Sequence, residues 1–388
     1  MTLVVEQMIH SMKESHNIVT MSSSSFENFD FEAAIRWHLD QVRKLRAPTG
    51  LFTASAHDVA TGYNKAWLRD IYFMTLGFKY TGEMETVRDT AKALLKVLDK
   101  HREKIQWAVR NKPYATWQYI HARYNPETFE EYWEEWGNKQ NDAVAEVLYL
   151  ISDCEVNGFL VAENDEERSL VQLLVNYLNA IEYWQDADSG IWEENQEVRA
   201  SSIGAVVCAL KCAAKLQYVI IPDGMIEKGE YALRSMLPRE TKNRFCDLAL
   251  LTLIFPFEVT TPQETELILS NVEYFLTRDQ GVIRYRNDRY YNNNEDGYSE
   301  EAEWSMGLAW LCIIYARMGN MEKAEEYFWR AQKTVDPQGL IPELWYSHTL
   351  RPNDNNPLGW AESMYVVALA VMRDSLLNNS GNRPVPHQ

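Results

Sequence analysis

Amphipathic stretches with helical spacing follow one another along most of the chain, with hardly any period-2 alternation between them. The connections after even-numbered stretches are mostly short, whereas those after odd-numbered stretches include long ones. If successive helices alternate in direction, the long loops all emerge at one end, which is where a site would be built. The stretches that predict helices are residues 31–45, 68–80, 84–99, 140–153, 166–183, 198–217, 223–236, 246–254, 262–276, 300–317, 321–333 and 357–377.

This count and alternation predict an all-α fold, a closed ring of six helical hairpins known as an (α/α)6 barrel. A helical-repeat solenoid is the alternative, but no fixed-period repeat supports it. We expect residues 1–29 to form a flexible arm, residues 30–378 the barrel and residues 379–388 a tail. The long loops to be gathered at one end are residues 46–67, 100–139, 184–197, 277–299 and 334–356.

The net charge of -18 argues against nucleic acid as a partner, because a polyanion would be repelled. A neutral substrate loses nothing in such a field. The thirteen tryptophans and 21 tyrosines could supply stacking platforms for sugars, although a helical protein also uses aromatic residues for packing.

The five cysteines are odd in number, lie mostly in apolar helical stretches and form no CxxC pair. They are expected to be buried thiols in a reducing compartment. Because the N-terminus lacks a continuous apolar core and no run of 18 apolar residues occurs, neither a secretory signal nor a membrane partner is expected. The sequence therefore favours a cytoplasmic location.

The segment Gly190-Ile191-Trp192-Glu193-Glu194 places two adjacent carboxylates behind an aromatic ring, just ahead of a predicted helix. A carboxylic acid packed against apolar rings has a raised pKa and can hold a proton near neutral pH, as a general acid must. Acidic residues also suit the N-terminal end of a helix, so this segment alone leaves both interpretations open.

Two other long loops carry residues that suit sugar chemistry. The neighbours Arg69 and Asp70 could hold adjacent sugar hydroxyls through charge-assisted bonds, or could simply cap a helix. Glu343 is a second carboxylate expected at the same end as Glu193. An inverting glycosidase needs such an acid and base on opposite faces of the sugar, about 6.5–9.5 Å apart, to admit a water molecule.

With these segments in hand, the chain from about residue 31 to residue 377 resembles glycoside hydrolase family 15, the glucoamylase-like enzymes. It also resembles the related N-terminal domain of phosphorylase kinase alpha subunits. Five segments in the family's order carry the resemblance: Ala66-Trp67-Leu68-Arg69-Asp70, Trp136-Gly137-x-x-Gln140-x-Asp142, Gly190-Ile191-Trp192-Glu193-Glu194, Arg284-Tyr285-x-x-Asp288-x-Tyr290-Tyr291 and Ile341-Pro342-Glu343.

The resemblance implies an (α/α)6 barrel that releases β-glucose, with inversion, from non-reducing ends of α-glucans or maltooligosaccharides. Glu193 matches the position of the general acid and Glu343 that of the general base. No cofactor and no metal are implied. Substrate binding is expected of Trp67, Arg69, Asp70, Trp136, Gln140, Asp142, Trp192, Glu194, Arg284, Tyr285 and Trp345.

Two departures from the pattern of secreted glucoamylases favour a second interpretation. Asn138 stands where the fungal enzymes carry an arginine that helps to hold the glucose. The segments Ala200-Ser201-Ser202-Ile203-Gly204 and Ile341-Pro342-Glu343-Leu344-Trp345-Tyr346 look closer to the kinase-subunit branch. The alternative is therefore a non-catalytic glucan-binding or regulatory domain. Linkage preference, chain-length preference and oligomeric state stay open at this point.

Overall fold

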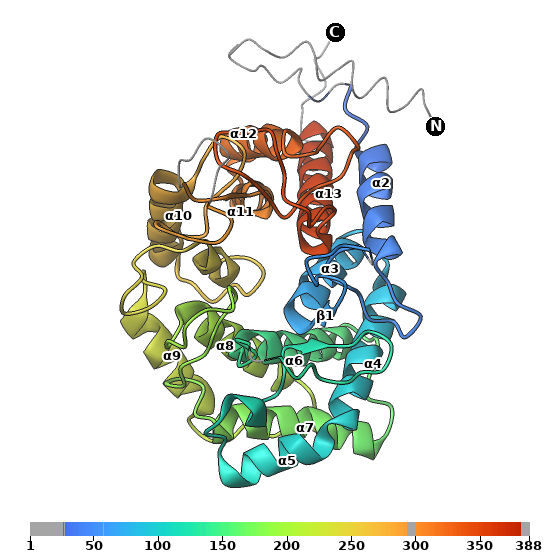
Figure 1. The fold of residues 1–388 in the computed structure, drawn as a ribbon, viewed down its shortest axis with the longest axis vertical. Coiled ribbons are helices and arrows are strands. Elements are labelled where there is room, and N and C mark those ends of the chain that lie inside the picture. The colour runs from blue at the N-terminus through green and yellow to red at the C-terminus, as the bar shows by residue number, and fades with distance from the viewer. Residues whose placement is uncertain (1–25, 27, 57, 135, 293–299, 382–388) are drawn as a thin grey trace.

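The structure is a computed structural model that describes residues 26, 28–56, 58–134, 136–292 and 300–381. Six helices form a closed inner ring in which each contacts the next, and the last contacts the first (Figure 1). The predicted (α/α)6 barrel is confirmed. The inner ring consists of α3 (Leu68–Tyr80), α6 (Asn141–Val156), α8 (Ala200–Ala213), η2 (Leu248–Leu253), α11 (Met306–Arg317) and α13 (Gly359–Gly381).

The outer helices surround this ring, each preceding an inner helix in the chain. They are α2 (Phe31–Lys44), α4 (Met84–Lys100), α7 (Asp165–Ala180), α9 (Met225–Met236), α10 (Pro262–Leu276) and α12 (Met321–Gln332). The two rings differ because their sequences differ. Helices α3 and α11 are apolar on nearly every face and buried throughout most of their length, whereas α4 buries one apolar stripe and exposes its charged residues.

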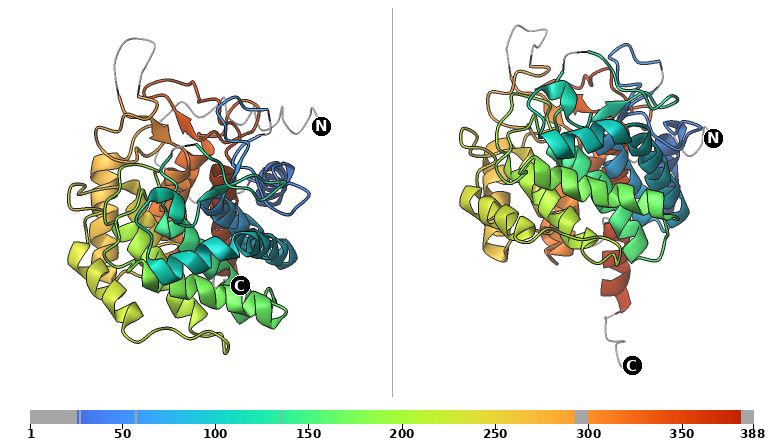
Figure 2. Two further views of the ribbon diagram at one scale, coloured as in Figure 1. Left: turned by 60° about the horizontal axis from the view of Figure 1, so that its bottom comes forward. Right: turned by 90° about the horizontal axis from the view of Figure 1, so that it is seen from below.

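The long connections lead from outer helices to the N-terminal ends of inner helices, and they gather at one end of the barrel (Figure 2). Two short antiparallel ladders join these loops to one another. In the first, β1 (Ala66–Trp67) pairs with β2 (Arg123–Tyr124), and in the second, β3 (Glu303–Trp304) pairs with β4 (Leu344–Trp345). Loops distant in sequence are therefore held in register where a site would be built.

Several expected boundaries were wrong. The 100–139 connection contains a helix, α5 (Arg102–Asn111), and a 3-10 turn, η1 (Thr116–Gln118). Helix α5 buries only Ile105 and Ala108, too sparse an apolar pattern to indicate a helix. The expected helix 246–254 is the 3-10 helix η2, which is followed closely by Pro256.

The two ends of the barrel also differ from expectation. Helix α13 continues to Gly381, into the expected tail, and residues 382–388 lie outside the described residues. Most of the expected arm also lies outside them. Phe26 and Phe29, however, pack against Phe328 and Trp329 of α12, with ring centroids 5.1–5.7 Å apart, so this part of the arm is anchored.

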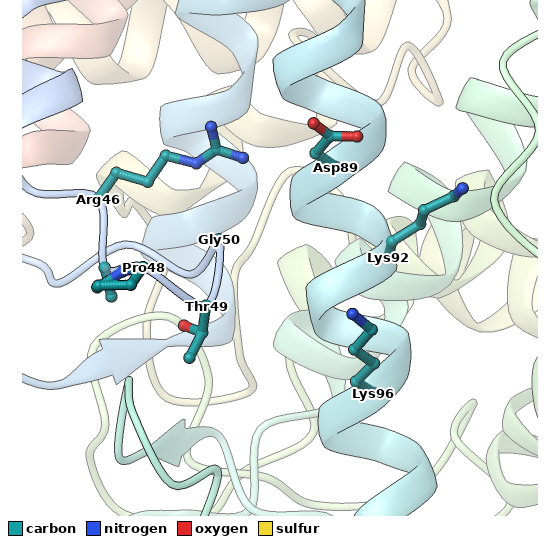
Figure 3. A pocket seen from close by; sticks show the side chains of 8 residues that line it. Arg46, Pro48, Thr49, Gly50, Asp89, Lys92 and Lys96 are labelled. Atoms are coloured by element: carbon teal, nitrogen blue, oxygen red, sulfur yellow. The ribbon is translucent and has the colours of Figure 1, made fainter.

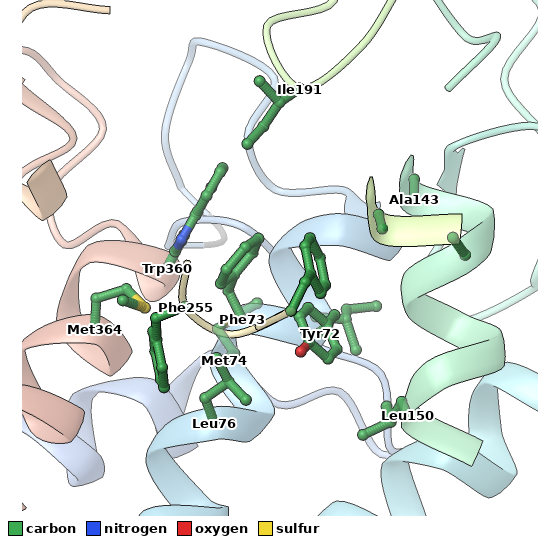
Figure 4. Packing of buried hydrophobic residues seen from close by; sticks show 14 of the residues in the cluster. Tyr72, Phe73, Met74, Leu76, Ala143, Leu150, Ile191, Phe255, Trp360 and Met364 are labelled. Carbon is green, nitrogen blue, oxygen red and sulfur yellow. The ribbon is translucent and has the colours of Figure 1, made fainter. Parts of the chain in front are cut away.

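Aromatic packing inside the ring supports the loop end. Phe73 of α3 stacks on Trp360 of α13 with ring centroids 4.4 Å apart (Figure 4). Trp310 of α11 meets both rings edge-on. Phe73 and Trp310 are fully buried, and Trp360 is nearly so. Since Trp360 also lines the pocket described below, Phe73 supports the floor of that pocket.

We expect Phe73→Ala to lower the free energy of unfolding by about 3–5 kcal/mol, because it removes a buried ring and leaves a cavity. Denaturant titration with intrinsic fluorescence would measure the change. Leu377→Ala is the matched control, because Leu377 on α13 is exposed and its truncation should leave stability nearly unchanged. A Phe73→Ala protein as stable as the control would contradict this account of the core.

Candidate active site

A pocket of about 260 Å³ opens at the loop end of the barrel, at the N-terminal ends of inner helices. It contains both candidate carboxylates, five tryptophans and four cations, which is a chemical mixture suited to a sugar. Its lining residues are Thr61, Gly62, Tyr63, Lys65, Trp67, Arg69, Asp70, Arg123, Trp136, Ile191, Trp192, Glu193, Arg284, Tyr290, Trp304, Glu343, Leu358 and Trp360.

A larger hollow of about 510 Å³ lies between the turn at residues 46–50 and helix α4 (Figure 3). Its lining combines Arg46, Asp89, Lys92 and Lys96 with small residues and contains no aromatic side chain. Because it has neither a stacking surface nor a pair of carboxylates, the chemistry points to the smaller pocket.

Glu193 lies in the loop before α8 in a left-handed backbone conformation, with φ of 61°. This conformation is uncommon for a residue with a side chain and is typical of functional positions. The turn at Gly137 packs directly on it, because a Cβ atom at Gly137 would lie 2.9 Å from the Glu193 carbonyl oxygen. A glycine is therefore required where Trp136 is brought against Glu193.

The Glu193 carboxylate accepts a hydrogen bond from Nη2 of Arg69 at 3.0 Å. Burial raises the pKa of Glu193, and the positive charges of Arg69 and Arg123 and a hydrogen bond from Trp67 lower it in part. Since the net shift is upward, the group keeps its proton to a higher pH than an ordinary glutamate does. That is the behaviour required of a general acid.

Glu343 precedes α13 and is almost fully buried. Three donors converge on its carboxylate: the Tyr63 hydroxyl at 2.9 Å, Nδ2 of Asn353 at 2.6 Å and Nδ2 of Asn355 at 2.7 Å. Burial raises the pKa of Glu343, whereas these hydrogen bonds oppose the rise by stabilising the anion. The net shift of the Glu343 pKa is still upward, but three fixed donors that favour its anion are what a general base requires.

Arg69 and Asp70 occupy the first turn of α3, immediately after β1. Gln140 and Asp142 fix the Arg69 guanidinium by accepting from Nη1 at 2.6 Å and 3.3 Å. Burial raises the pKa of Asp70 to about 7, although Arg69 lowers it. The pair thus presents a fixed donor fork beside an acid group in the pocket.

Arg284 enters from the loop before α11, and Asp288 clamps it with two hydrogen bonds of 2.6 Å. Its guanidinium carbon lies 5.3 Å from the ring centre of Trp192, 4.8 Å from that of Tyr290 and 5.1 Å from that of Trp304. Bidentate pairing and aromatic contacts leave this cation little freedom, so it can position a ligand accurately.

The structure brings eight of the thirteen expected site residues to the pocket: Trp67, Arg69, Asp70, Trp136, Trp192, Glu193, Arg284 and Glu343. The other five do not line the pocket, and their expected contacts with a substrate stay predictions. They are Gln140, Asp142, Glu194, Tyr285 and Trp345.

Each of these five has another place. Gln140 and Asp142 hold Arg69 from behind, as described above. Glu194 accepts a hydrogen bond from Nη2 of Arg244 at 2.7 Å and another from the Tyr285 hydroxyl. Glu194 and Tyr285 therefore belong to a polar network beside the pocket. Trp345 is buried on β4, opposite Glu303. Neighbouring residues in a loop point in different directions, and sequence spacing does not reveal which one faces inward.

The sequence did not indicate three residues that contact the candidate base, which are Tyr63, Asn353 and Asn355. It also did not indicate two cations that line the pocket, Lys65 and Arg123. Tyr63 also bonds the Tyr290 hydroxyl at 2.9 Å. Residues 353–356 read Asn-Asp-Asn-Asn in a long loop, a polar cluster that could have been noticed. Arg123 is brought in by the β1 and β2 pairing, for which no sequence signal was recognised.

Three further expectations concern the whole chain. All five cysteines are buried and free, as predicted. Within the described ranges, no group of histidine, cysteine, aspartate and glutamate side chains is arranged to hold a metal ion. None of the helices in that part of the chain has the length and apolar character needed to cross a membrane.

Comparison with known proteins identifies relatives of two kinds. The family model described as glycosyl hydrolases family 15 matches residues 38–230. The probable phosphorylase b kinase regulatory subunit alpha of Caenorhabditis elegans is 28% identical over 295 residues, which cover 63% of this chain and 24% of that protein. Its counterpart in Drosophila melanogaster is 26% identical over 353 residues, which cover 76% of this chain and 27% of that protein. An uncharacterized glycosyl hydrolase of Methanocaldococcus jannaschii is 23% identical over 229 residues, covering 51% and 36%.

This chain spans about a quarter of the length of those kinase subunits. Among solved structures, a wild-type glycosidase superimposes with a TM-score of 0.75 at 19% identity, covering 88% of this chain and 97% of that chain. A bacterial glucoamylase complexed with acarbose superimposes with a TM-score of 0.68 at 17% identity, covering 89% of this chain and 57% of that chain.

The fold is a glucoamylase-like (α/α)6 barrel, the fold of the matched glycosidase and glucoamylase structures. Within that fold class, the chain is related to glycosyl hydrolases family 15 and to the alpha subunits of phosphorylase kinase.

Proposed function

We propose that this chain is an inverting, exo-acting α-glucosidase that releases β-glucose from non-reducing ends of α-glucans or maltooligosaccharides. The observation that carries the proposal is the presence of two differently held carboxylates in one aromatic pocket. Burial raises the pKa of both groups, but Glu193 faces the Arg69 guanidinium, whereas Glu343 accepts three hydrogen bonds from neutral donors that favour its anion. Their environments suit opposite tasks in proton transfer.

In the proposed reaction, Glu193 donates its proton to the glycosidic oxygen as the bond from that oxygen to C1 breaks. Glu343 accepts a proton from a water molecule, whose oxygen attacks C1 from the opposite face. Arg69, Asp70 and Arg284 bind hydroxyls of the terminal glucose, and Trp136 stacks on the sugar. The products are β-glucose and a shortened glucan.

The stereochemistry of the first product tests this proposal. Proton NMR of the purified protein with maltotriose should show the β-anomer of glucose at early times, before mutarotation. Early α-glucose would mean that the paired-carboxylate mechanism is misassigned. The absence of glucose from maltotriose, isomaltose and trehalose would exclude hydrolysis and favour the second function below.

The kinase relatives favour a second candidate function, a glucan-binding or regulatory domain without turnover. The curated relatives that cover 63% and 76% of this chain are named as regulatory subunits. Other subunits of a kinase would then be the partners of this chain. This function requires that an inhibitor mimicking the protonated sugar binds while no α-glucoside is cleaved, a result that calorimetry and NMR together would provide.

Tyr63→Phe is expected to move the acidic limb of the pH profile upward by up to about one pH unit. Tyr63 donates to the Glu343 carboxylate, so loss of its hydroxyl destabilises the anion and raises the pKa of Glu343. Since the base works only when deprotonated, activity should then appear at a higher pH. The measurement is kcat/KM against pH. Tyr114→Phe, which changes an exposed tyrosine, is the matched control, and an unmoved acidic limb would contradict this role of Tyr63.

A further inference from the structure

Exposed tryptophans are concentrated in one loop region. Among the described residues, three tryptophans are more than a third exposed: Trp107 at 38%, Trp117 at 70% and Trp133 at 100%. All three belong to residues 101–140, the connection that also delivers Trp136 to the pocket. A large aromatic ring left in water is unfavourable, and such exposure marks an interaction site more often than chance.

Trp133 lies at the rim of the candidate active site. Its two neighbours, Tyr132 and Glu134, both contact cations that line the pocket. Nζ of Lys65 lies 4.3 Å from the ring centre of Tyr132 and 3.0 Å from Oε1 of Glu134. Arg123 likewise lies over Tyr132, at 5.4 Å, and donates to Glu134. The segment 132–134 therefore forms one edge of the pocket mouth.

Trp133 itself extends into solvent. Its neighbours Tyr132 and Glu134 reach back toward Lys65 and Arg123. The Trp133 side chain between them is 100% exposed, so its ring is open to a ligand at the rim.

Charge at the rim selects among possible occupants. Lys65 and Arg123 are both paired with the Glu134 carboxylate, which offsets one of their two positive charges. The chain as a whole carries a net charge of -18. A neutral ligand with an extended apolar face fits this setting better than an acidic polymer does.

We propose that Trp133 is a stacking platform for a glucose unit of the substrate outside the pocket. The substrate class is then an α-glucan oligosaccharide or polysaccharide that extends past the rim, rather than a disaccharide. This inference rests on the proposed function of the pocket as a glucan site. Trp133 touches a remote part of the substrate and takes no part in proton transfer.

Isothermal calorimetry with maltoheptaose and maltose tests the proposal. Both titrations use chains carrying Glu193→Gln, so that turnover does not disturb the heats. Adding Trp133→Ala should reduce the ratio of maltoheptaose affinity to maltose affinity by about tenfold, the size expected for truncation of an important aromatic contact. Trp133→Phe should restore most of that ratio, because a ring remains available for stacking.

Tyr231→Ala is the matched control, since Tyr231 is 79% exposed on the outer helix α9. In the Glu193→Gln background, it should leave the ratio of maltoheptaose affinity to maltose affinity unchanged. An unchanged ratio for Trp133→Ala, or equal weakening for both sugars, overturns the inference. So does failure of the background chain to bind maltoheptaose. If the wild-type chain cleaves no α-glucoside but the Trp133-dependent ratio persists, the hydrolase assignment fails and the glucan platform stands.

Discussion

Glu193→Gln is expected to lower kcat/KM for maltotriose by about 10²–10⁴-fold, the contribution typical of a general acid. The amide has nearly the same shape, and its oxygen can still accept from Arg69, but it has no acidic proton for the glycosidic oxygen. Because the acid must be protonated to work, wild-type activity should fall as pH rises through the raised pKa of Glu193. The variant should lose this alkaline limb.

The leaving group provides the decisive control for Glu193. Fluoride departs without protonation, so α-glucosyl fluoride should remain a far better substrate for Glu193→Gln than maltotriose. Glu127→Gln, a substitution at an exposed position in the loop between β2 and α6, should leave both activities unchanged. Equal losses with both substrates would mean that Glu193 does not act as the acid, and near-normal turnover of maltotriose would remove it from the mechanism.

Glu343→Gln is expected to reduce kcat/KM by a similar factor of about 10²–10⁴, but for every substrate, including α-glucosyl fluoride. An amide cannot take a proton from the attacking water, and this step is needed whatever group leaves. Since the base must be ionised, wild-type activity should rise as pH rises through the pKa of Glu343. The variant should lose this acidic limb.

Chemical rescue separates a base from a structural residue at position 343. Azide attacks without losing a proton, and the smaller side chain of Glu343→Ala leaves room for it beside the sugar. With α-glucosyl fluoride, azide should restore turnover and yield β-glucosyl azide, as fluoride leaves from the opposite face. Thermal unfolding would check that the variant folds. A folded Glu343→Ala protein that azide does not rescue would contradict the assignment of Glu343 as the base.

The barrel was predictable because burial imposes a regular pattern on the sequence. An inner helix such as α11 must be apolar on every face, whereas an outer helix such as α4 needs only one stripe, and the two kinds alternate along the chain. Helix α5 escaped prediction for the same reason, since it buries only Ile105 and Ala108. The 3-10 helix η2 has only six residues, but it takes the place of an inner helix between α8 and α11.

The site was predictable only in part. Glu193, Glu343 and the Arg69 and Asp70 pair stand in recognisable segments, and all four line the pocket. Tyr63, Asn353 and Asn355 form the environment of Glu343, but they come from the loops before α3 and α13 and meet only in three dimensions. Gln140 and Asp142 were expected to touch substrate, whereas they fix Arg69 from behind.

The sequence by itself determined the all-α class and the alternation of long and short connections, and it singled out the two carboxylates that we propose as acid and base. These features depend on local periodicity and on residue type, which a linear chain displays directly. Only the tertiary structure decided which loop residues face the pocket, how burial and fixed donors distinguish Glu193 from Glu343, and that Trp133 stands free at the rim. The physical reason is that side-chain direction and solvent exposure depend on neighbours distant in sequence, such as the pairing of β1 with β2 that brings Arg123 beside Trp67.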